Sequence, residues 1–557
     1  MLSYRKLAMR VLGRPLHTGG GIDSPRPASQ RAAALVLTAA MLTTFTAPAF
    51  AKTWYIEDGD ITISASETKG TNKVSQGAEP EVEDTDTVIT NNNRDTASSH
   101  TVTIDAGNDK VEVTLKDVNI KADSGSALTS NGDVTLTLKG ENHLTGGNGD
   151  IYGGDGITSS GSLTISGGTV TATGGNNTGS DGSGGSGIYS VSGSVTISGG
   201  TVNATGGEGS KNNSTSGGSG IYSDSGDVTI SGGTVNANGG NGGTISGGDG
   251  ICSSGGVTIS SGSTVTANGG SGEDGSGGRG ITSNGGVTVS GGTVNAKGGS
   301  GKNGNGGDGI LSFNPVAISG GTVKSNGGSG TISGGDGIRS LDHVAISGGT
   351  VKSNGGSGNL SGGNGIISYD IDLSGSLELT AKAGSPNGKA LSRAGKELDL
   401  NTIKDKLGPG AKVTVTDANG KVNQVSIPRP VEPEEPVIPE ESSSSSDGGS
   451  ATSSAPASPF PGLTVTDKDG QRISYTSTQS GNTLTVCVGR FTASFRISLA
   501  TLRQLRAEGI DTITFQTILC STTLSVDELL AMGGEDTEVV LTHHIRSSTL
   551  TVGGKAV

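Results

Sequence analysis

The sequence predicts an all-β protein built around a right-handed parallel β-helix, a solenoid of about ten coils, followed by a small α+β module. Three observations lead to this fold class. The motif Gly-Gly-x-Gly-Ile-x-Ser occurs eight times, and successive motif isoleucines are 28 to 33 residues apart. A chain with 101 glycines but only 7 Phe, 7 Tyr and 1 Trp lacks the large side chains of an ordinary globular core. The glycines follow no three-residue period, which excludes collagen.

The N-terminus, residues 1–51, has the features of a signal peptide. A basic leader precedes an apolar run from Ala32 to Thr46, which ends in the small-x-small sequence Ala49-Phe50-Ala51. We therefore expect cleavage after Ala51 and a secreted or cell-surface protein. The alternative is an uncleaved membrane anchor. No later segment is apolar enough to span a bilayer, so we expect no stable membrane insertion after signal cleavage.

Each coil is predicted to contain three short strands with alternating inward and outward residues. In one coil these are residues 188–190, 195–197 and 201–204, with the apolar side chains on the inner face. Degenerate copies of the motif at Leu128 and Leu391 extend the array. We assign residues 52–122 to an N-terminal cap and first strands, 123–395 to the β-helix repeats, and 396–427 to a C-terminal cap.

The motif residues themselves are interpreted as scaffold. The Gly-Gly pairs are predicted to lie where the chain turns with positive φ. The serines are predicted to form a buried column that satisfies its own hydrogen bonds, since a hydroxyl both donates and accepts. No histidine or other base repeats with these serines, so no catalytic residue is assigned to them.

Length differences between coils fall almost entirely between the third strand and the next Gly-Gly pair. The inserted loops are therefore expected along one edge of the solenoid. In repeat proteins such an edge is often the binding side. Drift in a tolerant surface loop explains the Gly, Ser and Asn content equally well, and both interpretations remain open.

The C-terminal part of the chain changes character. Residues 428–461 are rich in Pro, Ser and acids and predict a linker. Residues 462–557 are patterned as a small α+β module, with Ser498 and Ser525 each placed to begin a helix. Its two strand-helix-strand stretches resemble each other, which suggests a duplication. Cys487 and Cys520 are candidates for a disulfide formed after export.

One variable position, two residues before each motif isoleucine, carries acids in several coils. The candidate calcium ligands in this acid column are Asp155, Asp249, Asp308, Asp336 and Asn364. Asp308 and Asp336 belong to neighbouring coils, where two carboxylates about 5 Å apart repel each other unless something compensates. The alternative is that each Asp hydrogen-bonds its own turn.

The outward position after the motif isoleucine supplies candidate ligand-binding residues. Tyr189 and Tyr222 occupy it in adjacent coils, where stacked rings would form a small platform for a sugar. The alternative is two isolated surface tyrosines. Arg339 occupies the same position further along, and Arg279 stands in the acid column between Asp249 and Asp308. We assign both arginines to ligand binding.

The segments Thr135–Asn142 and Val113–Ile120, together with the Val-Thr-Ile-Ser-Gly-Gly-Thr-Val coils, resemble secreted bacterial β-helix proteins classed as carbohydrate-binding domain proteins. The resemblance covers residues 100 to 395. It implies a pectate-lyase-like, adhesin-like solenoid, polysaccharide binding and calcium sites, without established catalysis.

Three functions follow as hypotheses. The first is a secreted, non-catalytic polysaccharide-binding or adhesin-like surface protein, a monomer whose partner is a polysaccharide or cell-surface glycan. It requires no cofactor, with calcium as the one ion considered. The second is a calcium-dependent polysaccharide lyase on the same fold, for which Arg279, Arg339, Lys324 and Lys352 are available bases, although they form no distinct cluster in the sequence. The third is a structural stalk that displays the C-terminal module. A formal charge of −14 argues against nucleic acid as a partner.

Overall fold

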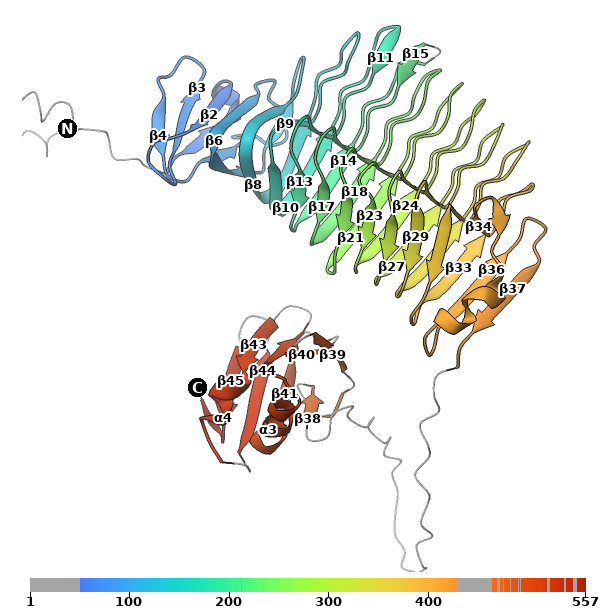
Figure 1. Cartoon of the computed structure of the whole chain (residues 1–557). Helices are drawn as coiled ribbons and strands as arrows, with labels where there is room; N and C mark the ends of the chain where they lie inside the picture. Colours follow the sequence, from blue (N-terminus) through green and yellow to red (C-terminus); the bar gives the residue numbers. More distant parts are fainter. Residues whose placement is uncertain are drawn as a thin grey trace, which may run out of the picture. The chain divides into compact units, whose positions relative to one another are not determined.

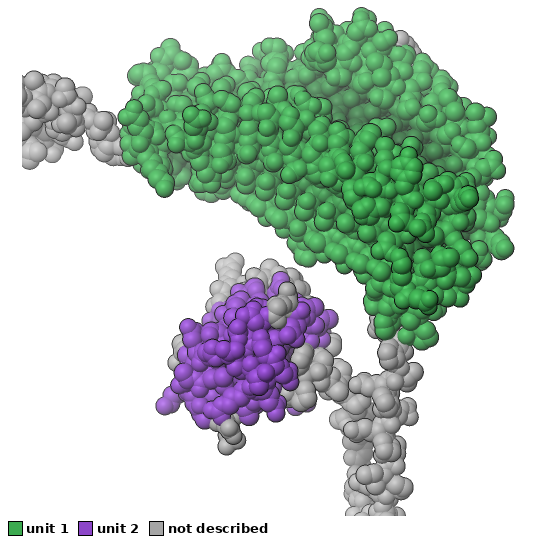
Figure 2. Space-filling view, viewed as in Figure 1, with its two compact units in different colours: residues 1–433 green, residues 434–557 purple. Residues whose placement is uncertain are grey.

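The computed structural model describes residues 51–428, except residue 212, and residues 463–556 with gaps at 468–470, 474, 481, 489, 491, 518–520, 535–536 and 544–547. The predicted signal peptide, apart from Ala51, and the predicted linker, apart from Pro428, lie outside these residues. The chain forms two compact units, residues 1–433 and 434–557 (Figure 2). Among the described residues, no helix is both long and apolar enough to cross a bilayer.

The first unit is a solenoid of three parallel strand ladders, which stack coil upon coil (Figure 1). The ladder that carries the Ile-x-Ser motif contains β2 (Ile61–Ala65), the start of β6 (Val102–Lys116), the start of β8 (Leu128–Thr145), β9 (Ile157–Ser160), β12 (Ile188–Ser190), β16 (Ile221–Ser223), β19 (Ile251–Ser253), β22 (Ile281–Ser283), β25 (Ile310–Ser312), β28 (Ile338–Ser340), β31 (Ile366–Ser368) and β34 (Leu391–Arg393).

The second ladder contains β1 (Thr53–Tyr55), β5 (Val88–Thr90), later parts of β6 and β8, the start of β10 (Leu163–Thr173), β13 (Val195–Ile197), β17 (Val228–Ile230), β20 (Val257–Ile259), β23 (Val287–Val289), β26 (Val316–Ile318), β29 (His343–Ile346) and β32 (Asp370–Leu373). The third contains β7 (Asn119–Lys121), the ends of β8 and β10, β14 (Thr201–Thr205), β18 (Gly233–Asn238), β21 (Ser263–Asn268), β24 (Thr293–Lys297), β27 (Thr322–Asn326), β30 (Thr350–Asn354), β33 (Glu378–Lys382) and β36 (Lys412–Thr416).

The predicted alternation of inward and outward residues is confirmed. In the coil of β12, β13 and β14, the inward side chains are fully buried, namely Ile188, Val195, Ile197, Val202 and Ala204. Thr196, Thr201 and Asn203, which lie between them, remain partly exposed. Stacking in register completes the backbone hydrogen bonds and joins these side chains into one apolar core along the solenoid.

The solenoid has about 13 turns rather than about ten. Ile61 pairs with Val102, which pairs with Leu128, so strands upstream of Leu128 belong to the same ladder. These coils were missed because residues 52–122 lack the Gly-Gly-x-Gly-Ile-x-Ser signature while keeping the inward apolar residues. An antiparallel excursion, β3 (Asn72–Gln76) and β4 (Val82–Asp84), branches from β2.

At the C-terminal end, β36 continues the third ladder and β37 (Val422–Ser426) folds back antiparallel along it. A 3-10 helix, η2 (Leu400–Lys406), and the short β35 (Lys396–Glu397) precede this hairpin. The hairpin occupies the edge of β36 that would otherwise be open to pairing.

The prediction of positive φ at the Gly-Gly pairs is confirmed in the Ser-Gly-Gly turns, but it is wrong for the pairs of the motif and for the pairs that follow the third strand. Positive φ occurs in the Ser-Gly-Gly turn that leads into the third strand, as at Gly200, where φ is 77°. The other Gly-Gly pairs lie in two extended legs of each coil. One leg leaves the third strand, and the other returns to the next motif isoleucine. We call these legs with their connecting loops, residues 206–220 in one coil and the equivalents elsewhere, the glycine fin. Its thin paired traces run along one edge of the strand ladders (Figure 1).

Close approach of backbones explains the glycines of the fin. The N–H of Gly248 donates to the carbonyl of Gly240, and the N–H of Gly270 donates to the carbonyl of Gly248, both at 2.8 Å, so outgoing and returning legs alternate. A Cβ on Gly248 would overlap the carbonyl oxygen of Gly218. The two longest inserts add a small parallel pair to the fin, β11 (Asp181–Ser183) and β15 (Ser214–Ser216).

The serine column is buried, but it does not satisfy itself. Ser283 Oγ donates to the carbonyl of Gly286 at 2.8 Å and accepts from the Gly286 N–H at 3.1 Å. The backbone of the following turn therefore provides the partners. Ser312 departs from this pattern, because its buried Oγ has no hydrogen-bond partner among the described residues. Pro315 stands there in place of Gly286 and has no N–H to donate.

The C-terminal module contains two sheets and two short helices. One sheet consists of β38 (Leu463–Thr466), β41 (Ala493–Ser498), β44 (Glu538–His543), β45 (Ser548–Val552) and β46 (Lys555–Ala556), and the other of β39 (Thr476–Ser480), β40 (Thr483–Cys487), β42 (Thr512–Gln516) and β43 (Ser521–Ser525). Ser498 caps α3 (Leu499–Ala507), and Ser525 caps α4 (Val526–Leu530). β41 pairs with β44 and β42 pairs with β43, as expected for two interlocked strand-helix-strand halves.

Candidate functional site

The acid column lies where the returning legs of the fin meet the Ile-x-Ser ladder, and most of its side chains bond to the next coil. Asp308 Oδ1 accepts the backbone N–H of Asp336 at 2.7 Å, and Asp336 Oδ1 accepts the N–H of Asn364 at 2.6 Å. Asp155 and Asp249 bond in the same way to the N–H groups of Ser186 and Arg279. Asp155 also bonds its own turn, because its Oδ2 accepts a hydrogen bond from the Thr158 hydroxyl at 2.7 Å. The column therefore ties consecutive coils together.

Burial controls the charge of this column. It raises the pKa of Asp308 to about 6, helped by repulsion from Asp336, while the neighbouring N–H of Asp336, Arg279 and Arg339 act in the opposite direction. Burial also raises the pKa of Asp336, and its Oδ2 lies 3.7 Å from Arg339 Nη1. Repulsion between the two carboxylates is thus relieved by backbone hydrogen bonds, an arginine and partial protonation.

A calcium ion at the acid column would need oxygen ligands beyond those of the predicted residues. Calcium takes six to eight oxygen ligands, whereas one oxygen of each acid already accepts a backbone N–H. No group of three or more Asp, Glu, His or Cys side chains in the described ranges is arranged to hold a metal ion. Calcium dependence stays a prediction, which chelation tests.

Tyr189 and Tyr222 are stacked, with ring centroids 5.2 Å apart and an angle of 13° between their planes. One face of each ring therefore covers one face of the other and is not available to a sugar. The Tyr222 hydroxyl is already engaged, since it donates to Asp224 Oδ1 at 2.7 Å. Next in the column is Cys252, where burial raises the pKa of the thiol to about 12. The stacked pair is therefore a weaker sugar platform than two separate ring faces would be.

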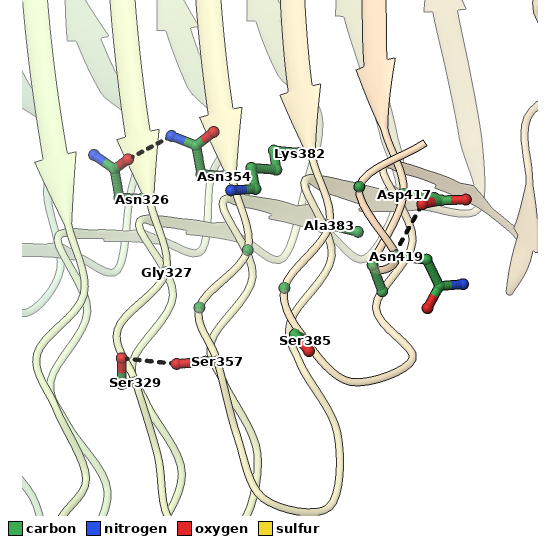
Figure 3. A pocket seen from close by; sticks show the side chains of 15 residues that line it. Asn326, Gly327, Ser329, Asn354, Ser357, Lys382, Ala383, Ser385, Asp417 and Asn419 are labelled. Atoms are coloured by element: carbon green, nitrogen blue, oxygen red, sulfur yellow. Dashed lines mark hydrogen bonds between the residues drawn. The ribbon is translucent and has the colours of Figure 1, made fainter. Parts of the chain in front are cut away.

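A groove runs where the third strand ladder meets the fin, near the C-terminal end of the solenoid (Figure 3). Its cavity volume is about 630 Å³. Equivalent positions of successive coils supply the wall: Asn326 and Asn354 end β27 and β30, and Lys382 ends β33. The turn between β36 and β37, residues 417–420, closes one side.

The polar groups of the groove form a regular pattern. Asn354 Nδ2 donates to Asn326 Oδ1 at 2.7 Å, and the hydroxyls of Ser329 and Ser357 lie 3.3 Å apart. In Figure 3 the Lys382 side chain lies beside Asn354. Asp417 Oδ1 accepts the backbone N–H of Asn419 at 2.9 Å, which holds the turn in place. Amides, hydroxyls and an ammonium group thus face the same hollow.

A second hollow of about 430 Å³ adjoins the first and shares Asn354, Gly355 and Lys382 with it. It is lined in addition by Lys352, Thr380 and Thr416. Of the residues that line the two hollows, the sequence pattern indicated only Lys352, as an available base. The signal was present in the repeat Thr-Val-Lys-Ser-Asn at 322–326 and 350–354, which replaces the earlier Thr-Val-Asn-Ala.

The remaining candidate residues do not join this groove. Arg279 and Arg339 lie near the acid column, where their positive charges act to lower the pKa of Asp308. In the C-terminal module, the Cys487 thiol donates to Gln516 Oε1 at 3.5 Å. Its proposed disulfide partner Cys520 lies outside the described residues, so the disulfide stays a prediction.

Comparison with known proteins supports the fold and is limited to one part of the chain. A family model described as a beta helix repeat matches residues 163–187, which span β10, the fin loop that contains β11, and the approach to β12. No curated protein and no solved structure matches the chain.

Proposed function

We propose that this protein binds polysaccharide in the groove along β27, β30 and β33, without catalysing a reaction. The observation that carries the proposal is the groove itself, where amide, hydroxyl and ammonium groups from successive coils face a hollow of about 630 Å³. Sugar hydroxyls both donate and accept hydrogen bonds. Asn amides and Ser hydroxyls meet both requirements, which suits neutral parts of a glycan.

The repeat supports a polymeric ligand in particular. Asn326, Asn354 and Lys382 occupy one column of three successive coils at a spacing of about 4.8 Å, so an extended chain that crosses these coils meets a polar group at each step. The groove is also open to solvent at its margin, where Lys382 and Ser329 are exposed. A chain longer than the hollow can therefore lie in it without having to enter end first.

We further infer export and a surface-associated, adhesin-like role. The support is the leader of residues 1–51 and the resemblance to secreted solenoid proteins. A monomer is sufficient for this function, because one chain supplies the whole groove.

The test is affinity electrophoresis and sedimentation of the full mature chain with a panel of soluble and insoluble polysaccharides. Asn326→Ala with Asn354→Ala removes the amide pair of the groove. Asn238→Ala with Asn268→Ala is the matched control, because this pair occupies the same column and makes the same hydrogen bond, at 2.8 Å, away from the groove. We expect the first double variant to weaken binding about tenfold and the control to bind like the parent chain. Absence of binding to every glycan would refute the proposal.

Three further arms address the other hypotheses. Calcium dependence predicts that a chelator abolishes binding. A lyase would release unsaturated products from acidic polysaccharides. A structural stalk would bind no glycan through the solenoid, and deletion of residues 462–557 would then remove whatever binding the full chain shows.

A further inference from the structure

Lysines gather on the outward face of the third ladder next to the groove. Lys324 of β27 and Lys352 of β30 are in direct register on neighbouring parallel strands. Lys382 of β33 follows in the next coil, in register with Asn354. All three side chains are exposed. We call Lys324, Lys352 and Lys382 the lysine patch.

None of the ion pairs between described residues involves these three lysines. At the outward positions of β27, β30 and β33 the one acid is Glu378, which is in register with Lys412 of β36. Asp417 also lines the groove, but its carboxylate accepts the backbone N–H groups of Asn419 and Lys421.

The arrangement runs against the charge of the whole chain. The formal net charge is −14, yet positive charge is concentrated on three consecutive coils. Like charges directly opposite each other on neighbouring strands are destabilising. A bound anion lying across Lys324 and Lys352 would remove this repulsion and gain charge-assisted hydrogen bonds.

The patch and the groove are continuous. Lys352 and Lys382 both line the second hollow, and Lys382 lines the first as well. A ligand in the groove therefore contacts ammonium groups and the amide of Asn354 together. Amides bind hydroxyl groups and ammonium groups bind anions. A ligand that fits the groove therefore carries both hydroxyl groups and anionic groups.

We propose that the groove takes an anionic polysaccharide, whose carboxylate or sulfate groups bind the lysine patch while its hydroxyls bind the amides and hydroxyls of the groove. This inference rests on the proposed polysaccharide-binding function and names the class of polymer. A polysaccharide fits better than nucleic acid, because the amides and hydroxyls beside the lysine patch match sugar hydroxyls, and the described residues that line the groove include no aromatic ring on which a base could stack.

The experiment uses the full mature chain and pairs of polymers that share a backbone. Carboxymethyl cellulose is compared with hydroxyethyl cellulose, and dextran sulfate with dextran, by affinity electrophoresis at low and high salt. We expect the parent chain to bind at least one charged polymer about tenfold more tightly than its neutral counterpart, with the difference lost at high salt. Which charged polymer binds identifies carboxylate or sulfate as the group that is recognised.

The decisive variant replaces the patch, Lys324→Gln with Lys352→Gln and Lys382→Gln. Its matched control is Lys116→Gln with Lys139→Gln and Lys121→Gln, because Lys116 and Lys139 are also in register on neighbouring strands. We expect the patch variant to lose the preference for the charged polymer and the control to keep it. Circular dichroism confirms that both variants are folded.

The outcomes separate this inference from the proposed function. Equal binding of charged and neutral polymers, with Asn326 and Asn354 still required, would overturn the anionic class and leave polysaccharide binding intact. Loss of preference in the control variant would show that general charge, not the patch, is responsible. Binding of duplex DNA as tightly as the charged polysaccharides, lost in the patch variant, would overturn the assignment to a polysaccharide.

Discussion

Asp308 Oδ1 accepts a hydrogen bond of 2.7 Å from the backbone N–H of Asp336, the equivalent residue of the next coil. The same bond recurs from Asp336 to Asn364, and Asn364 Oδ1 accepts the N–H of Lys389. An acid at a variable position of the motif thus connects neighbouring coils. Burial of the ionised carboxylate is unfavourable, and the raised pKa of Asp308 reflects this.

Replacement of this carboxyl predicts a pH-dependent gain in stability. With a folded-state pKa of about 6, Asp308 holds a proton in the folded protein that the unfolded chain releases near pH 4. The contribution of Asp308 to the free energy of unfolding is therefore fully present below about pH 4, and it is lost as the pH rises through about 6. Asp308→Asn keeps the acceptor oxygen and removes the charge.

We expect Asp308→Asn to raise the free energy of unfolding by about 1–2 kcal/mol at pH 7.5 and to change it little at pH 4. Urea unfolding of the full chain at both pH values measures the difference. Equal destabilisation at both pH values would show that the charge of Asp308 is not opposed by its surroundings.

The glycine fin predicts a sharp contrast between two glycines. Gly248→Ala places a methyl group onto the carbonyl of Gly218 and should cost about 2 kcal/mol or more, because backbone cannot move aside without breaking the ladder. Gly199→Ala meets nothing within 4 Å and should change stability by no more than about 0.5 kcal/mol. Thermal unfolding followed by circular dichroism compares them. Similar midpoints for both variants would mean that the legs of the fin are not closely packed.

The same substitution, Ser→Ala, should have different effects on stability at two positions of the serine column. Ser283→Ala leaves the backbone of Gly286 without its buried partner and should cost about 1–2 kcal/mol. Ser312→Ala removes a buried hydroxyl that has no partner among the described residues, so it should be neutral or stabilising. Chemical unfolding of the two variants side by side decides. A comparable loss in both would indicate that Ser312 has a partner, such as a buried water.

The stacked tyrosines separate the groove from the other candidate surface. Tyr189→Ala with Tyr222→Ala removes the ring pair, in which one face of each ring covers one face of the other. We expect polysaccharide affinity to remain within about twofold of the parent chain, since the groove is untouched. A loss as large as that of the Asn326 and Asn354 double variant would place the binding surface at the tyrosines.

Much of the fold follows from the sequence because the repeat is explicit. Ile188, Val202 and their equivalents recur at fixed positions, and period-two alternation assigns them inward. The coils before Leu128 could not be counted, since Ile61 and Val102 keep the apolar position without the glycine signature. The role of Gly248 was equally hidden, because a need for glycine arises from close approach as well as from positive φ, and the sequence does not distinguish them.

The candidate site was harder to predict from the sequence than the fold. Attention to the motif itself led to Asp308 and Tyr222, whereas the groove is lined by outward residues of the third strand, far from the motif in sequence. Asn354, Lys382 and the turn at Asn419 come from three successive stretches of chain, and only the register of β30, β33 and β36 brings them together. To predict this register, one must know how many residues each loop uses between one coil and the next. The strand pattern alone does not give that number.

Hydrogen–deuterium exchange of the full chain, with and without a polysaccharide that sediments with it, tests polysaccharide binding in the groove. We expect slower exchange on ligand addition in residues 352–357, 380–385 and 416–421, which form the walls of the two hollows. Residues 188–190 and 221–223, around the stacked tyrosines, should be unchanged. Protection confined to those tyrosine strands, or to the C-terminal module, would contradict binding in the groove.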